Sequence, residues 1–171
     1  MCAEQSLWSV QVLTPDYLID GNFDSKDVVG LSFFSMQTGS NVPVASLQLT
    51  SALLQPTGNL AMPITPVAKW ITSFNDAFVG VIPLDEPSTA HALKNNKAPH
   101  PVPADVYVGP YLIRGIVMSP DKNLEILGDV LSFLVQNARI TCLTSGAQMT
   151  EIRAPNMLVR TLLLQGIAPH G

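Results

Sequence analysis

The feature of this sequence that most constrains its fold is a segment that occurs twice. The run YLIDG at residues 17–21 returns as YLIRG at residues 111–115, 94 residues later. In each copy a short β-type run precedes the tyrosine, and a proline (Pro15 or Pro110) stands between the two. A chain that repeats its own pattern is expected to fold into two similar units or into one unit with two similar halves.

Two further matches follow in the same order. The run LTSALL at residues 49–54 matches VQNARI at 135–140, and FVGVI at 78–82 matches LLQGI at 163–167. Three matches in one order indicate an internal duplication. We therefore expect four positions to form two equivalent pairs, which are Tyr17 with Tyr111 and Gly21 with Gly115. The glycines are expected at strand ends or bulges, where a side chain would clash or φ is positive.

The composition of the runs predicts an all-β chain with one or two short helices. Valine, isoleucine, leucine and tyrosine cluster in short runs that suit a pleated sheet, and Gly, Pro, Asn and Ser separate them. We expect a first repeat at residues 1–87 and a second at 105–171. Residues 88–104 are expected to form a short helix and a proline-rich linker, because acidic residues and a proline at 85–87 mark a helix start.

The expected order of strands in each copy resembles that of small SH3-like or Sm-like β-barrels. The pattern "YLIxG … LTxAxI" also resembles an uncharacterised bacterial family of small β-domains. The resemblance implies two tandem small β-barrel repeats packed together, either as separate barrels or as one merged sandwich. It carries over no catalytic residue, and the first copy departs from the pattern through its long connection at residues 22–46.

The chain carries few charges for its size. Charged residues make up 13% of it and apolar residues 47%, whereas an average soluble chain has roughly 25% charged residues. Either uncharged polar residues cover the surface, or copies of the chain or a partner cover apolar surface. The connection at 22–46 contains an apolar patch, which either folds over its own core or forms a contact surface. The candidate interaction residues are Leu31, Phe33, Phe34 and Met36.

The charges are unevenly distributed between the copies. Residues 1–87 hold eight acidic residues and two lysines, and all four arginines lie in the second copy. An acidic balance does not suit phosphate neutralisation, which argues against nucleic acid as a partner. The acidic residues Asp16, Asp20, Asp24 and Asp27 form either a solvated loop or a site for a cation or a basic partner. If the copies pack about a pseudo-twofold axis, Asp20 and Arg114 are expected to approach each other.

The sequence contains no arrangement typical of catalysis. His91, His100 and His170 are scattered, and Cys2 and Cys142 lack metal-ligand spacing. Nucleophile and phosphate-binding motifs are missing as well. We therefore expect no catalytic, cofactor-binding or metal-binding residues and no enzyme activity. No apolar run is long enough to span a bilayer, and the first residues lack the features of a secretory signal, so we expect a cytoplasmic protein.

These observations favour a non-catalytic β-module that acts as a structural or assembly subunit. Its partner would be the chain itself, as a homo-oligomer, or the other protein subunits of a larger complex. The alternative is an Sm-like binding module for a small ligand or nucleic acid.

Overall fold

The computed structural model describes residues 6–34, 46–58, 63–73, 78–125, 127, 130–144 and 151–171. These residues form ten β-strands, one α-helix and short 3-10 segments. The strands are β1 (Leu7–Leu13), β2 (Tyr17–Asp24), β3 (Ser46–Pro56), β4 (Thr65–Ser73), β5 (Gly80–Pro83), β6 (His100–Val108), β7 (Tyr111–Ser119), β8 (Ser132–Cys142), β9 (Ile152–Arg160) and β10 (Leu164–Pro169). The helix is α1 (Glu86–Asn95), and two 3-10 segments are η1 (Gly30–Phe34) and η3 (Thr161–Leu163).

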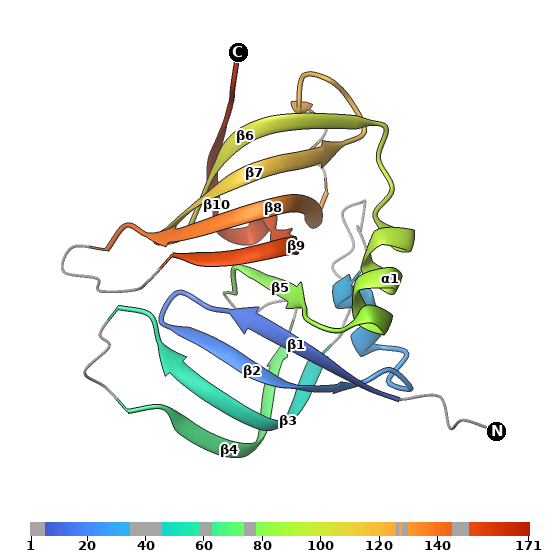
Figure 1. Cartoon of the computed structure of the whole chain (residues 1–171), viewed down its shortest axis with the longest axis vertical. Helices are drawn as coiled ribbons and strands as arrows, with labels where there is room; N and C mark the ends of the chain where they lie inside the picture. Colours follow the sequence, from blue (N-terminus) through green and yellow to red (C-terminus); the bar gives the residue numbers. More distant parts are fainter. Residues whose placement is uncertain are drawn as a thin grey trace.

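All ten strands belong to one antiparallel sheet with the order β10-β6-β7-β8-β9-β5-β1-β2-β3-β4. The first half contributes β5-β1-β2-β3-β4 and the second half contributes β10-β6-β7-β8-β9, so corresponding strands follow the same order. The halves meet where β5 pairs with β9. Figure 1 shows one half above the other, with β5 and β9 between them. The mostly-β expectation is therefore confirmed.

The sheet is open, and in this respect it differs from the closed barrels that the sequence suggested. Strand β5 pairs with β1 on one side and with β9 of the other half on the other side. Both edges of β5 are thus occupied, and β5 does not close the first half against β4. Strands β4 and β10 are left as the two ends of the sheet.

The two halves also share their strand register. Val12 pairs with Ile19 in the first half, and Val106 pairs with Ile113 at the corresponding place in the second. Tyr17 and Tyr111 each begin the second strand of their half. The register agrees with the sequence offsets for the first three strands of each half. At β5 and β10 it is shifted by one residue from the sequence match, so that Gly80 and not Val81 is the counterpart of Gly166.

A β-bulge occurs at the same place in both halves. The ladder between the second and third strands skips Gly21 in one half and Gly115 in the other. A Cβ atom on Gly21 would lie 2.8 Å from the Cβ of Leu49, and one on Gly115 would lie 2.7 Å from the carbonyl oxygen of Gln136. Both glycines therefore permit a close approach of the neighbouring strand, which a side chain would prevent.

Two apolar clusters lie against each other across the boundary between the halves. The first gathers around Trp8 and Phe23 of the first half and includes Leu158 of β9. The second gathers around Tyr111 of the second half and includes Leu13 of β1. Because each cluster contains residues from both halves, separating the halves would expose apolar surface in both.

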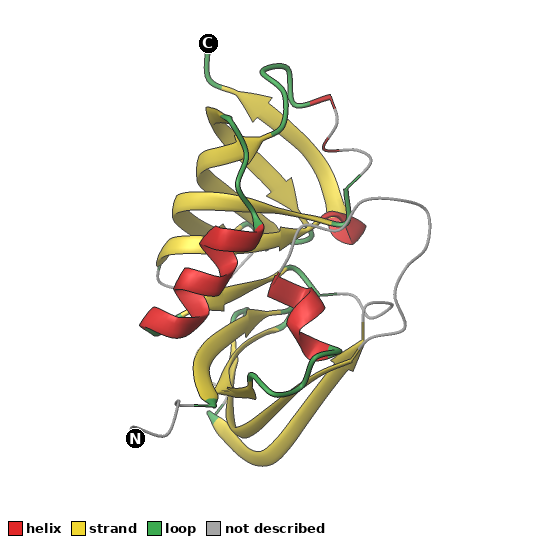
Figure 2. Ribbon diagram, turned by 90° about the vertical axis from the view of Figure 1, so that its right-hand side faces the viewer, coloured by secondary structure: helices red, strands yellow, loops and turns green. Residues whose placement is uncertain are grey.

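Helix α1 begins at a well-formed N-cap and contacts β1, β5 and η1 of the first half. It lies at the side of the sheet, at the level where the halves meet (Figure 2). The carboxylate of Asp85 accepts hydrogen bonds from the backbone N–H of Ser88 (3.1 Å) and from that of Ser9 in β1 (2.6 Å). This residue therefore caps the helix and also attaches it to the sheet. After the helix, β6 starts at His100, so Pro101 and Pro103 lie within a strand.

Candidate interaction surface

The apolar patch of the 22–46 connection covers its own core in this structure. Phe33 and Phe34 have only 3% and 0% of their surface exposed, and Leu31 is partly buried. The ring of Phe34 contacts that of Trp8 at 5.6 Å between centroids. Met36, the fourth candidate interaction residue, lies outside the described residues. Of the two expectations for this patch, the structure therefore agrees with burial inside the chain.

The contact between the halves is an edge-to-edge strand pairing. Gly80 pairs with Val159 and Val81 with Leu158. One more hydrogen bond extends this short ladder, because the backbone N–H of Arg160 donates to the carbonyl oxygen of Val79 at 2.8 Å. We call this pairing of β5 with β9 the internal junction.

A buried tyrosine strengthens the internal junction with side-chain hydrogen bonds. The hydroxyl of Tyr111 donates to the carbonyl oxygen of Thr14 at 2.7 Å and lies 2.7 Å from Oγ1 of Thr57. Since its proton is used on Thr14, the tyrosine oxygen accepts from the Thr57 hydroxyl. Burial raises the pKa of Tyr111 to about 12, although the Thr57 hydrogen bond acts in the opposite direction.

The outer ends of the sheet expose apolar side chains. Ile71 on β4 and Leu162, which precedes β10, each have 54% of their surface exposed. An edge strand presents backbone N–H and C=O groups to solvent, and native proteins usually shorten, charge or cover such edges. Pro66 and Lys69 protect the first part of β4 in this way, whereas Ile71 lies beyond them.

Three arginines lie side by side on neighbouring strands of the second half. Arg114 on β7 is directly opposite Arg139 on β8, which is directly opposite Arg153 on β9. All three are exposed. A depression of about 350 Å³ adjoins Arg139 and Arg153 and is lined also by Asn137, Ala138, Ala154 and Pro155. Like charges directly opposite each other destabilise a sheet unless anionic groups compensate them. Arg153 already has such a group, because its Nε lies 3.3 Å from the Glu151 carboxylate.

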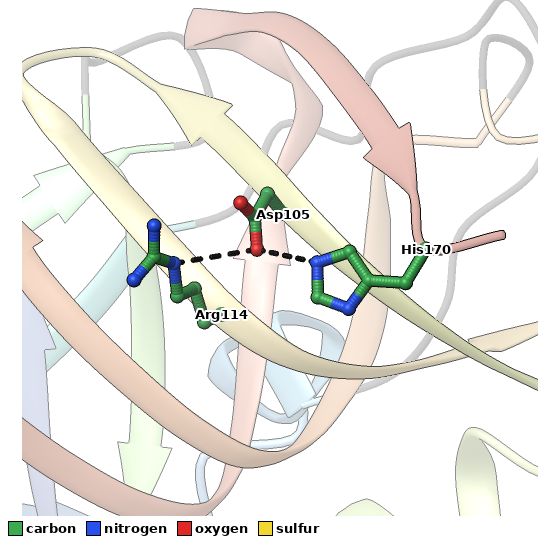
Figure 3. A network of polar contacts seen from close by, with 3 residues as sticks. All are labelled: Asp105, Arg114 and His170. Atoms are coloured by element: carbon green, nitrogen blue, oxygen red, sulfur yellow. Dashed lines mark hydrogen bonds and ion pairs between the residues drawn. The ribbon is translucent and has the colours of Figure 1, made fainter.

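The first of these arginines belongs to a small polar network (Figure 3). The Asp105 carboxylate lies 3.5 Å from Nε of Arg114 and 2.8 Å from Nε2 of His170. In the first half the equivalent pair is Gln11 and Asp20, whose side chains hydrogen-bond at 2.7 Å. Asp20 and Arg114 thus each bond within their own half. The halves follow one another in the same strand order along the sheet, with equivalent strands running in opposite directions. This arrangement does not bring Asp20 and Arg114 together across a pseudo-twofold axis.

The other titratable residues singled out in the sequence do not converge. His91 packs its ring on that of Trp8 at 5.2 Å, and its pKa is lowered by burial and, to a smaller extent, by Lys94. His100 begins β6, and Cys142 is a partly buried free cysteine at the end of β8. Within the described ranges, no three His, Cys, Asp or Glu side chains form a group that could hold a metal ion.

Searches against protein-family models, curated proteins and solved structures each gave no match for this chain. In the part of the chain that the structure describes, no helix has both the length and the apolar character required to cross a membrane.

Sequence reasoning missed the internal junction, the outer edges and the row of arginines. The sequence places all four arginines in the second copy, but the alignment of these three depends on strand register. Part of the signal was present, because Arg114 lies in the repeat segment 111–115 and Arg139 in the repeat segment 135–140. These two segments belong to neighbouring strands, and their register places the two arginines opposite each other.

Proposed function

We propose that this chain is a non-catalytic β-module that acts as a structural or assembly subunit, either of a homo-oligomer or of a larger protein complex. The observation that carries the proposal is the open ten-stranded sheet, whose two outer strands β4 and β10 have no strand beyond them among the described residues. An exposed edge with apolar side chains readily accepts another strand.

The low charge of the chain supports the same function. With 13% charged residues, the chain has little charged surface to keep copies apart. Two halves of the chain already associate through an edge contact, so this fold can be assembled by strand pairing. The burial of Phe33 and Phe34 moves the proposed contact from the 22–46 connection to the edges of the sheet.

Sedimentation velocity and light scattering over a wide concentration series test this proposal. A mass that rises with concentration, or a stable oligomer at the lowest concentration, is the expected result. A mass that stays at that of one chain, together with no stable partner in a complex isolated from the native source, would contradict it.

A second candidate function is the binding of a small anionic ligand or of nucleic-acid phosphates. The row formed by Arg114, Arg139 and Arg153 favours it, because bound phosphate would relieve the repulsion between neighbouring guanidinium groups. Titration with inorganic phosphate, a nucleotide and single-stranded RNA at low salt tests this candidate. Arg139→Gln should weaken any such binding, whereas Lys26→Gln in the first half should not.

A further inference from the structure

The shared register of the halves gives each residue of the internal junction a counterpart at an outer edge. Strand β5 corresponds to β10, so Val81 corresponds to Ile167. Strand β9 corresponds to β4, so Leu158 corresponds to Ile71. The two strands that meet inside the chain therefore have their equivalents at the opposite ends of the sheet. In Figure 1, β4 lies at the bottom and β10 runs behind β6 and β7.

A glycine is present at the same position of both β5 and β10. At Gly80 a Cβ atom would lie 2.3 Å from the carbonyl oxygen of Leu158, so the internal junction requires glycine there. At Gly166 a Cβ atom would meet nothing within 4 Å, and φ lies outside the positive region. The ladder between β10 and β6 shifts register between Leu164 and Gly166. Because φ of Gly166 is not positive, this bulge does not require glycine there, and a glycine in a strand costs conformational entropy. A backbone carbonyl group of another strand, packed against Gly166 as that of Leu158 packs against Gly80, would explain why residue 166 is a glycine.

The apolar residue on the other side of the contact shows the same difference. Leu158 on β9 is covered at the internal junction and has 2% of its surface exposed, whereas its counterpart Ile71 on β4 has 54% exposed. If another strand paired with β4 in the way that β5 pairs with β9, that strand would cover Ile71. Pro66 and Lys69 do not obstruct this contact, since the internal junction uses only the last residues of β9.

We infer that β10 of one copy pairs antiparallel with β4 of a second copy, with Ile167 opposite Ile71. This inference rests on the proposed assembly function and names its partner and register. The carbonyl oxygen of Ile71 then faces Gly166 of the neighbouring copy, as that of Leu158 faces Gly80. The joined edges are different surfaces, so the contact is head-to-tail and extends into a closed ring or a filament.

The tyrosines supply an independent consequence of the same geometry. Tyr111 bonds across the internal junction to Thr14, and the counterparts of these two residues are Tyr17 and Val108. In the assembly, the hydroxyl of Tyr17 is placed at the turn that follows Val108 of the neighbouring copy. Tyr17 is partly buried within one chain, and the described residues provide no hydrogen bond to its hydroxyl.

The test compares two unobstructed glycines, one on the outer strand β10 and one in a loop. Gly166→Val should leave the melting temperature of the single chain unchanged and raise the dissociation constant of the assembly by about tenfold or more. Gly58→Val is the matched control, because a Cβ atom on Gly58 would also meet nothing within 4 Å and this glycine lies in the loop after β3. Tyr17→Phe should weaken assembly as well, without lowering the stability of the chain.

Cysteine cross-linking tests the register directly, in a background with Cys2→Ser and Cys142→Ala. Paired residues of antiparallel strands have Cα atoms about 4.5–5.5 Å apart, which suits a disulfide. A mixture of Ile71→Cys and Ile167→Cys chains should form a covalent dimer under mild oxidation. Lys69→Cys mixed with Ile167→Cys is the control, and it should form much less.

The outcomes separate this inference from the proposed function. A wild-type chain that assembles, with neither an effect of Gly166→Val nor a cross-link between residues 71 and 167, would overturn the edge pairing and leave the assembly function standing. A wild-type chain that stays monomeric at every concentration would overturn the pairing between copies. Loss of assembly in Gly166→Val together with the specific cross-link would establish it.

Discussion

The hydroxyl of Tyr111 lies 2.7 Å from the carbonyl oxygen of Thr14, although the two residues belong to different halves of the chain. Tyr111 is fully buried, and Thr57, also buried, completes the arrangement. The bond joins the start of β7 to the turn between β1 and β2. One phenol group thus connects the two repeats beside the internal junction.

Removing that hydroxyl should destabilise the chain. In Tyr111→Phe the buried Thr57 hydroxyl and the Thr14 carbonyl lose a partner, at a cost of about 1–3 kcal/mol in the free energy of unfolding. Tyr17→Phe is the matched control and should leave the stability of the single chain unchanged. Urea unfolding of both variants at a concentration where assemblies dissociate checks this; equal midpoints for the two would contradict it.

The stability should also depend on pH at the alkaline end because of Tyr111. Its pKa is raised to about 12 in the folded chain, against about 10 for an unperturbed tyrosine. A raised folded-state pKa gives a stabilisation that is complete below about pH 10 and is lost as the pH rises toward 12. Unfolding midpoints from pH 9 to 12, compared between wild type and Tyr111→Phe, measure this; the extra alkaline loss should vanish in the variant.

Both bulge glycines should resist enlargement. Gly115→Val would drive the new side chain against the Gln136 carbonyl, and Gly21→Val would drive it against Leu49. Overpacking of this kind costs about 1–3 kcal/mol. Thermal melting of the two variants beside Gly58→Val, the unobstructed glycine, gives the comparison. Melting temperatures equal to that of Gly58→Val would mean that the bulges relax without strain.

Charges placed on the buried phenylalanines should unfold the first half. Phe33→Asp combined with Phe34→Asp buries two carboxylates without partners, at a cost of several kcal/mol. Val28→Asp combined with Val29→Asp is the control, since these neighbours have 78% and 54% of their surface exposed. Circular dichroism should show loss of structure only in the phenylalanine variant. If the phenylalanine variant stayed folded but no longer assembled, the contact between chains would involve the connection at residues 22–46 and not the edges of the sheet.

The sequence predicted the parts of the fold that depend on local pattern. The duplicated YLI segment indicated equivalent strands, and Asp85 with Pro87 marked the start of α1, as observed. The internal junction could not be predicted, because β5 and β9 are apolar strands whose composition does not select a partner. The positive φ angles of Ser51 (50°) and Asn137 (51°) could not be predicted from the sequence either. Serine gives no signal for that conformation, and the strain follows from the bulge.

The edge residues were missed for a related reason. Ile71 and Leu158 are similar side chains at matched positions, and periodicity assigns both to a strand. Only the arrangement of the whole sheet makes one exposed and the other buried. Conversely, Phe33 and Phe34 were candidates for a contact surface because they lie in a turn-rich connection. Phe34 contacts Trp8, and the side chain of Asn96 donates a hydrogen bond to the Phe34 carbonyl at 2.8 Å. Both partners are distant from Phe34 in sequence, so the local pattern could not predict its burial.

Joining two repeats within one polypeptide through β5 and β9 has a consequence for stoichiometry. Each chain contributes two such halves, so a closed head-to-tail ring of chains contains an even number of halves. Because residues 1–87 hold eight acidic residues and two lysines, whereas residues 105–171 balance five acidic residues with four arginines and one lysine, acidic and neutral halves alternate around such a ring. Duplication thereby doubles the period of the assembly and lets each copy specialise, which a ring of identical single repeats cannot do.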